Sequence, residues 1–162
     1  NRIKRMMVRS DNAAAEELAE SLPDGAFINS MNEKAAALSM RNTSFFDATG
    51  LSYLNQSTAY DIDILVSHIL ERHPEIFQWS RERELIIDGV VYDTINRFAK
   101  RPDFLGGKTG YTDDTNNLVS IFRTSAGPVT IIVLGATDKV ERFTYTEKIL
   151  EWISQQFNHS AY

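Results

Sequence analysis

The sequence predicts an α+β fold, in which a helical first half is followed by an antiparallel sheet with a C-terminal helix. Two observations support this class. Apolar residues recur at helical spacing in the first half, whereas the second half alternates short apolar runs with turn residues. We place the helical part at residues 1–83 and the sheet part at 84–162. Together they form one domain, for which 162 residues are enough.

The helical part contains three predicted helices. They cover residues 13–20, 27–38 and 62–70, with a loop at 42–56. Asp11 or Ser10 can cap the first helix, and a turn at residues 23–25 precedes the second. A capping-box sequence that starts at Thr58 opens the third helix, which must stop by Pro74.

The sheet part begins with a predicted hairpin at residues 84–93, whose Asp88-Gly89 pair is favoured in type I′ turns. Further strands are expected wherever apolar runs lie between turn residues, and a last amphipathic segment closes the domain. These elements are strands at 104–112, 118–124 and 129–137, and a helix at 143–157.

The composition narrows the class of function. A net charge of −5 argues against a nucleic-acid binder, and the absence of cysteine excludes disulfides, thiolate chemistry and cysteine-based zinc sites. The histidines share no metal-binding spacing with acids, so no metal or other cofactor is implied. The longest apolar run, Val129–Ala136, is too short to span a bilayer, and no export signal is visible in the chain.

The stretch FLGGKTGYTDDTNN contains G-K-T, the ending of a phosphate-binding loop. That motif, G-x-x-x-x-G-K-[ST], needs a glycine where this chain has Pro102. A phosphate loop also opens a helix, whereas residues 110–114 begin a helix poorly and include two acids. A plain edge strand with a surface lysine explains Lys108 better, unless a second motif accompanies it.

Such a second motif is Ser10-Asp11-Asn12, which lies directly before a predicted helix. S-D-N and K-T-G, together with S-x-x-K, are the signature of penicillin-binding proteins and class A β-lactamases. Each triplet alone has an ordinary explanation: Ser10 as a helix cap, Asn12 as a first-turn residue, and Lys108 and Thr109 as solvated strand residues. Found together and in this order, the two triplets favour an active-site role.

The resemblance extends over most of the chain. Five stretches resemble the D-alanyl-D-alanine carboxypeptidases, the low-molecular-mass penicillin-binding proteins. They are MMVRSDNAAAEELAE, FINSMNEKAAALSMRNTSFFDATGL, STAYDIDILVSHIL, FLGGKTGYTDDTNNLVSIF and VTIIVLGATDKVERFTYTEKILEW. The resemblance implies the β-lactamase/penicillin-binding transpeptidase-like fold, of which we expect a partial version here.

The resemblance also implies a chemistry. A family member is a serine-type hydrolase that cleaves peptidoglycan stem peptides ending in D-Ala-D-Ala through an acyl-enzyme, and β-lactam antibiotics mimic that substrate. Ser10 is expected to relay a proton toward the leaving amine. Asn12 is expected to hydrogen-bond the substrate backbone and steady the catalytic lysine, and Lys108 to supply positive charge near Ser10. Such work is done in the cell envelope, outside the cytoplasmic membrane.

The residues around K-T-G are expected to bind substrate. By resemblance, the Thr109 hydroxyl hydrogen-bonds the terminal carboxylate, and Gly110 lets the substrate backbone lie against the strand. The backbone N–H of Tyr111 would form half of an oxyanion hole. Thr112 would line the same face as Gly110.

One part of the signature is missing. No serine in the sequence is followed three residues later by a lysine, and nine residues precede Ser10. The nucleophilic serine and the general-base lysine are therefore expected to lie outside this chain, which we expect to be a fragment without activity of its own. A shortened, non-catalytic relative that binds peptidoglycan or β-lactams is the alternative. In either case, uncovered apolar surface predicts self-association or contact with an N-terminal segment supplied in trans.

A class A β-lactamase fits less well. Such an enzyme needs a deacylating glutamate in E-x-x-L-N. The chain has Leu54-Asn55, but Leu51 occupies the glutamate position.

Overall fold

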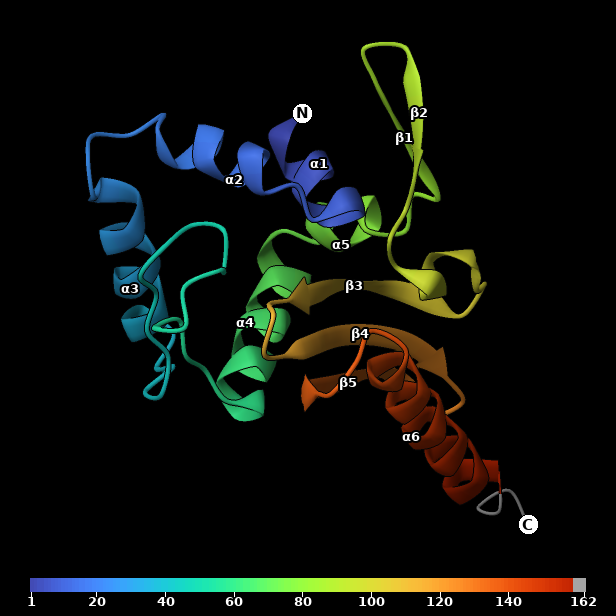
Figure 1. Ribbon diagram of the computed structural model, residues 1–162. Coiled ribbons are helices and arrows are strands. Elements are labelled where there is room, and N and C mark those ends of the chain that lie inside the picture. Colours follow the sequence, from blue (N-terminus) through green and yellow to red (C-terminus); the bar gives the residue numbers. More distant parts are fainter. Residues whose placement is uncertain (159–162) are drawn as a thin grey trace.

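The computed structural model describes residues 1–158 and confirms the α+β class (Figure 1). The helical part comprises α1 (Arg2–Arg9), α2 (Asn12–Ala19), α3 (Ala26–Ala37), α4 (Ala59–Arg72) and α5 (Glu75–Trp79). A hairpin of β1 (Glu84–Ile87) and β2 (Val90–Asp93) follows, and then the short 3-10 helix η1 (Arg97–Lys100). The last elements are β3 (Phe104–Tyr111), β4 (Asn116–Thr124), β5 (Gly127–Ala136) and α6 (Glu141–Asn158).

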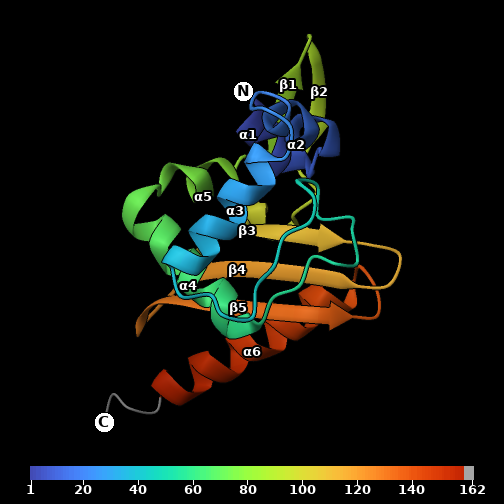
Figure 2. The same cartoon turned by 90° about the vertical axis from the view of Figure 1, so that its left-hand side faces the viewer.

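An antiparallel sheet with the strand order β3-β4-β5 forms the centre of the molecule. One face packs against α6, and the opposite face packs against α4 and α5 (Figures 1 and 2). Alternation along β4 divides the two cores, because Leu118 and Phe122 face α6 whereas Ile121 packs with Val66 and Phe77. β3 lies at one edge of this sheet, next to α5.

Hydrogen bonds to the side chains of Thr58 and Asp61 fix the start of α4 and the loop that precedes it. Thr58 caps α4 by accepting a hydrogen bond from the Asp61 N–H at 3.2 Å, as the capping-box pattern predicts. The buried Asp61 carboxylate accepts hydrogen bonds from the Asn42 N–H at 2.7 Å and from the Thr43 hydroxyl at 2.8 Å. Asp61 therefore anchors the preceding loop to the helix.

Several elements differ from the expectation. The sequence pattern did not indicate α5 or η1, which are too short to show a helical period. β5 begins at Gly127, so Ser125 and Ala126 alone form the turn after β4. Pro128 lies within β5 opposite Arg123, and the sheet accepts it because β5 is an edge strand.

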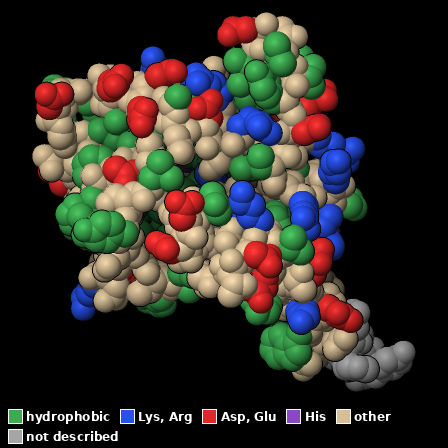
Figure 3. All heavy atoms as spheres, viewed as in Figure 1, with side chains coloured by type: hydrophobic (Ala, Val, Ile, Leu, Met, Phe, Trp, Pro, Cys, Tyr) green, Lys and Arg blue, Asp and Glu red, His purple; other side chains and the backbone are tan. Residues whose placement is uncertain are grey.

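The β1–β2 hairpin projects from the body of the molecule, and hydrophobic side chains cover much of it (Figures 1 and 3). Asp88 and Gly89 both have positive φ, 50° and 79°, as a type I′ turn requires. Lys and Arg side chains gather below the hairpin, over η1 (Figure 3). None of the helices within residues 1–158 combines the length and apolar character needed to cross a membrane.

A groove of about 690 Å³ lies between the sheet, the loop before α4 and the first turn of that helix. We call it the α4 groove. Its lining includes Phe45, Ile62, Lys108, Asn117, Val119 and Leu134. Apolar side chains from both walls therefore face a space that no described residue fills.

Candidate active site

Ser10 lies at a sharp corner between α1 and α2. It is the C-cap of α1 and has left-handed backbone angles, φ 53° and ψ 45°, which are uncommon for a residue with a side chain. Asp11 is the N-cap of α2 and accepts a hydrogen bond from the Ala14 N–H at 3.1 Å. Asn12 is the first residue of α2, so it is helical rather than part of the non-helical segment that the sequence analysis assumed.

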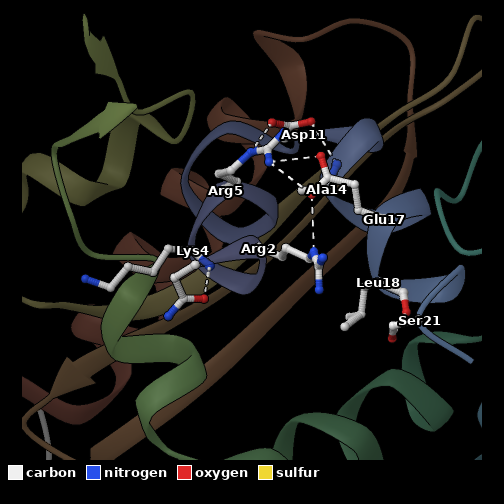
Figure 4. A network of polar contacts seen from close by, with 9 residues as sticks. Arg2, Lys4, Arg5, Asp11, Ala14, Glu17, Leu18 and Ser21 are labelled. Atoms are coloured by element: carbon white, nitrogen blue, oxygen red, sulfur yellow. Dashed lines mark hydrogen bonds and ion pairs between the residues drawn. The ribbon is translucent and has the colours of Figure 1, made fainter. Parts of the chain in front are cut away.

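An ionic network braces this corner (Figure 4). The Arg5 guanidinium contacts the Asp11 carboxylate at 2.8 Å and the Glu17 carboxylate at 3.1 Å, so it joins α1 to both ends of α2. Burial alone would raise the pKa of Asp11. The Ala14 N–H and Arg5 outweigh that effect and hold the pKa below its usual value. The corner therefore presents the Ser10 hydroxyl from a rigid support.

Lys108 reaches Ser10 from the sheet. Its Nζ donates a hydrogen bond to the Ser10 Oγ at 2.6 Å and also contacts the carbonyl oxygen of Thr109. Burial, assisted by the charge of Arg142, lowers the pKa of Lys108 to about 8. Residues from the two sequence motifs, 98 positions apart in the chain, thus form a direct polar contact.

Two glycines and a buried serine set the position of β3. A Cβ at Gly106 would lie 2.6 Å from the Phe77 Cβ, and one at Gly107 would lie 2.2 Å from the Val119 carbonyl oxygen. The buried Ser80 hydroxyl accepts a hydrogen bond from the Gly107 N–H at 2.9 Å. α5 therefore holds the strand one residue before Lys108.

A second hollow, of about 570 Å³, opens on the other side of Ser10. We call it the cationic cavity, because its lining contains Arg97, Lys139 and Arg142 and no acidic residue. The lining is completed by Ser10, Asn12, Leu51, Ile95, Thr109, Tyr111 and Phe143. Thr109 also lines the α4 groove, so it stands between the two hollows.

Arg142 is the most deeply placed of the three cations. It is buried, and its Nη1 donates hydrogen bonds to the carbonyl oxygens of Gly110 at 2.6 Å and Asn117 at 3.3 Å. Its Nε has no partner among the described residues. Burial, followed by repulsion from Arg97, lowers the pKa of Arg142. Bound negative charge at this point would relieve both effects.

The structure gathers most of the predicted residues, with one exception. Ser10, Asn12, Thr109 and Tyr111 line the cationic cavity, and Gly110 lines the α4 groove beside Lys108. Thr112 lines neither hollow; its hydroxyl accepts a hydrogen bond from the Thr115 N–H at 3.2 Å, inside the β3–β4 turn.

Sequence reasoning missed Arg97, Lys139 and Arg142. No short motif contains them, since they come from η1 and from the region where α6 begins. Only the return of the chain through β4 and β5 brings Lys139 and Arg142 next to Thr109 and Tyr111.

The arrangement is suited to proton transfer beside an anion site. A lysine with a pKa near 8 changes its charge close to neutral pH and is bonded to a hydroxyl that can pass on a proton. Within residues 1–158, no group of three His, Asp or Glu side chains is placed to hold a metal ion.

Comparison with known proteins identifies the family to which the chain is similar. Residues 2–138 match the D-alanyl-D-alanine carboxypeptidase family. The chain is 31% identical to a D-alanyl-D-alanine endopeptidase of Pseudomonas aeruginosa and 33% identical to one of Escherichia coli. Each alignment covers 91% of this chain and 51% of the relative.

Solved structures agree with the sequence matches. Penicillin-binding protein D2 from Listeria monocytogenes, in a cefotaxime-bound form, superposes with a TM-score of 0.83 at 30% identity. That match covers 91% of this chain and 63% of the other. Penicillin-binding protein 6B from Escherichia coli superposes with a TM-score of 0.82 at 27% identity. That match covers 93% of this chain and 50% of the other. The chain spans about half the length of the curated relatives it matches, and it belongs to the D-alanyl-D-alanine carboxypeptidase family, the low-molecular-mass penicillin-binding proteins.

Proposed function

We propose that the intact protein is a serine-type hydrolase that cleaves the peptide bond after a D-alanine in peptidoglycan stem peptides. In this proposal the present chain supplies one wall of the active site. The observation that carries it is the 2.6 Å contact between the Lys108 Nζ and the Ser10 Oγ, which joins the S-D-N and K-T-G motifs. Family membership supports the same reaction class.

The reaction proceeds through an acyl-enzyme. The Oγ of the S-x-x-K serine, which this chain lacks, bonds to the D-alanine carbonyl carbon, and the C–N bond breaks. The serine proton moves to the S-x-x-K lysine and from there, through Ser10 with Lys108 beside it, to the leaving nitrogen. Water then attacks the ester, so that the peptide leaves as a carboxylic acid and the serine regains its proton.

The remaining residues bind and orient the substrate. The Thr109 hydroxyl and Arg142 face the cationic cavity, where they bind the carboxylate of the leaving group. The Asn12 amide bonds the substrate backbone. The outer edge of β3 at Gly110 receives the peptide as an added strand, and the Tyr111 N–H stabilises the oxyanion.

β-Lactams are the second class of ligand in this proposal. The Listeria monocytogenes penicillin-binding protein D2 is known in cefotaxime-bound and ampicillin-bound forms, at 30% identity to this chain. A β-lactam carboxylate would occupy the Thr109 and Arg142 position. A peptidoglycan substrate is consistent with activity in the cell envelope, outside the cytoplasmic membrane, where peptidoglycan lies.

The α4 groove is the proposed seat of the S-x-x-K segment. It borders Lys108 and exposes apolar side chains from α4 and from the sheet, as an interface for a further helix would. That segment comes either from the same polypeptide or in trans. A second copy of this chain is the competing occupant.

The alternative function is that of a non-catalytic peptidoglycan-binding relative. Incubation of the full gene product with benzylpenicillin distinguishes the two. We expect intact-mass analysis to show one added penicilloyl group on the full product and none on the present chain. A folded full product without the adduct would favour the binding protein, and an adduct on the present chain would contradict the assignment of its nucleophile.

A further inference from the structure

The loop between α3 and α4 exposes apolar side chains at its tip. Four of the nine residues from Phe46 to Leu54 are large, apolar and exposed, and the rings of Phe46 and Tyr53 are 56% and 84% exposed. Neither ring packs against another ring or a cation among the described residues. Single exposed apolar residues are ordinary on a protein surface, whereas a group of them on one short loop indicates a binding surface. We call the rings of Phe46 and Tyr53 the aromatic platform.

A buried-type hydrogen-bond network holds the loop under the platform in one shape. The Asp47 carboxylate accepts hydrogen bonds from the N–H groups of Thr49 and Gly50, both at 2.6 Å, and from the Ser52 N–H at 2.7 Å. Burial alone would raise the pKa of Asp47. These bonds, with a further one from the Thr49 hydroxyl, outweigh burial and hold the pKa well below its usual value. The carboxylate is therefore ionised at neutral pH and keeps the loop closed.

Asn55 joins the two sides of the same loop. Its Nδ2 donates a hydrogen bond to the Asp47 carboxylate at 2.7 Å, and its Oδ1 accepts one from the Phe46 N–H at 2.7 Å. Phe46 is thus fixed to a residue that lies two positions after Tyr53 in the chain. Both rings stand on a backbone that is ordered before a ligand arrives, so binding to them requires little loss of conformational entropy.

The platform carries no outward charge. Asp47 is the only charged side chain in residues 42–60, although 24% of the residues in the whole chain are charged, and its carboxylate is used inside the loop. A surface of this kind attracts neither anions nor cations. It suits a neutral ligand that combines apolar faces with hydrogen-bonding groups, as a sugar ring does.

The loop also forms a wall of the candidate active site. Gly50 lines the α4 groove together with Lys108, and Leu51 lines the cationic cavity together with Thr109. Figure 2 shows the loop, in teal, beside the sheet. In peptidoglycan each stem peptide is attached to a glycan strand of N-acetylated amino sugars. Four extended residues reach roughly 14 Å, so a stem peptide lying on β3 keeps that strand close to the loop.

We propose that the aromatic platform binds the glycan strand to which the stem peptide is attached, with the C–H faces of the amino sugars packed on the rings of Phe46 and Tyr53. This inference rests on the proposed function and specifies its substrate as a peptide on glycan rather than a free peptide. The platform touches none of the reacting atoms, so it contributes equally to binding of the ground state and of the transition state. It therefore lowers KM and leaves kcat unchanged.

Two substrates test the proposal on the full gene product. One is a stem pentapeptide that ends in D-Ala-D-Ala and carries an N-terminal D-lactoyl group. The other is the same lactoyl peptide attached to one unit of a β-1,4-linked tetrasaccharide of N-acetylglucosamine, so the two differ only in neutral sugars. Release of D-alanine gives kcat and KM for each. We expect kcat/KM to be about tenfold higher for the glycan substrate, through KM, with the same ratio at high salt because no charge is involved.

Three variants assign the preference to the platform. Tyr53→Ala should reduce the ratio to less than about threefold. Tyr53→Phe should keep it, because the ring rather than the hydroxyl packs on the sugar. Trp152→Ala removes another exposed ring, which is 60% exposed on α6 and lines neither hollow, so this control should also keep the ratio.

The outcomes separate this inference from the proposed function. Release of D-alanine from the free peptide with a wild-type ratio near one would overturn the platform but leave the proposed function intact. A ratio that survives in Tyr53→Ala, or that is lost equally in Trp152→Ala, would overturn the assignment to the platform. No release from either substrate would overturn the function itself.

Discussion

The contact between Ser10 and Lys108 brings together residues that are 98 positions apart in the sequence, and its chemistry depends on burial. A lysine near the surface keeps a pKa near 10.5, whereas the surroundings of Lys108 lower its pKa to about 8. The shift means that the folded protein binds the Lys108 proton less tightly than the unfolded chain does. Lys108 therefore lowers stability at neutral pH.

This cost gives a pH-dependent prediction. Between pH 8 and pH 10 the unfolded state holds more protons at Lys108 than the folded state, so the lysine destabilises less as the pH rises. Lys108→Met removes the effect. We expect the difference in free energy of unfolding, wild type minus variant, to increase by about 2 kcal/mol from pH 8 to pH 10, as measured by urea titration. A difference that does not change with pH would show that Lys108 has an ordinary pKa.

At the scale of elements, the position of β3 depends on how closely α5 and β4 approach it. Gly106 and Gly107 permit contacts that no side chain could, and Ser80 secures the strand with a buried hydrogen bond. The two residues after Gly107 are Lys108 and Thr109. The glycines thus determine where the side chains of Lys108 and Thr109 lie.

The two glycines without positive φ in β3 offer a matched comparison. A Cβ at Gly107 would meet the Val119 carbonyl oxygen at 2.2 Å, so β3 or β4 must move. A Cβ at Gly110 meets the Asn117 side chain at 3.3 Å, which a small adjustment accommodates. We expect Gly107→Ala to lower the free energy of unfolding by about 2 kcal/mol or more, and Gly110→Ala by about 1 kcal/mol or less. Equal effects in urea titrations would refute this account.

Periodicity explains which elements the sequence could predict. α4 and α6 are long and amphipathic, and the hairpin has its Asp88-Gly89 turn, so local signals were enough. The sequence did not predict α5 and η1, because elements of four or five residues are too short to show a helical period. Within the candidate site, Ser10 and Lys108 belong to motifs, whereas Arg97, Lys139 and Arg142 meet only through tertiary structure. Burial and charge repulsion, which shape the cavity, leave no pattern in a single sequence.

At the scale of the whole molecule, the loop before α4 and the start of that helix face the sheet across the α4 groove. Apolar side chains line both walls, and a domain of this size would ordinarily bury such a surface. The proposed S-x-x-K segment would complete this core. We therefore expect the molecule to expose more apolar surface without that segment than with it.

Hydrophobic surface in the groove leads to a prediction for the isolated chain. We expect it to bind anilinonaphthalene sulfonate, or to associate in light scattering, more strongly than the full gene product. Leu134→Ser, in the groove, should lower dye fluorescence in the isolated chain. Val90→Ser changes a similarly exposed residue on the hairpin and serves as the control, since Leu134 is 45% and Val90 52% exposed. Equal fluorescence from the isolated chain and the full product would argue against a segment seated in the groove.

The backbone at Ser10 has a further consequence, for evolution rather than for chemistry. Its left-handed conformation costs about 1 kcal/mol relative to glycine, which adopts it freely. Replacement by glycine would make this corner more stable and would delete the hydroxyl that Lys108 contacts. Selection for stability alone would favour glycine here, so the serine carries a cost in stability that the proposed role of its hydroxyl would explain.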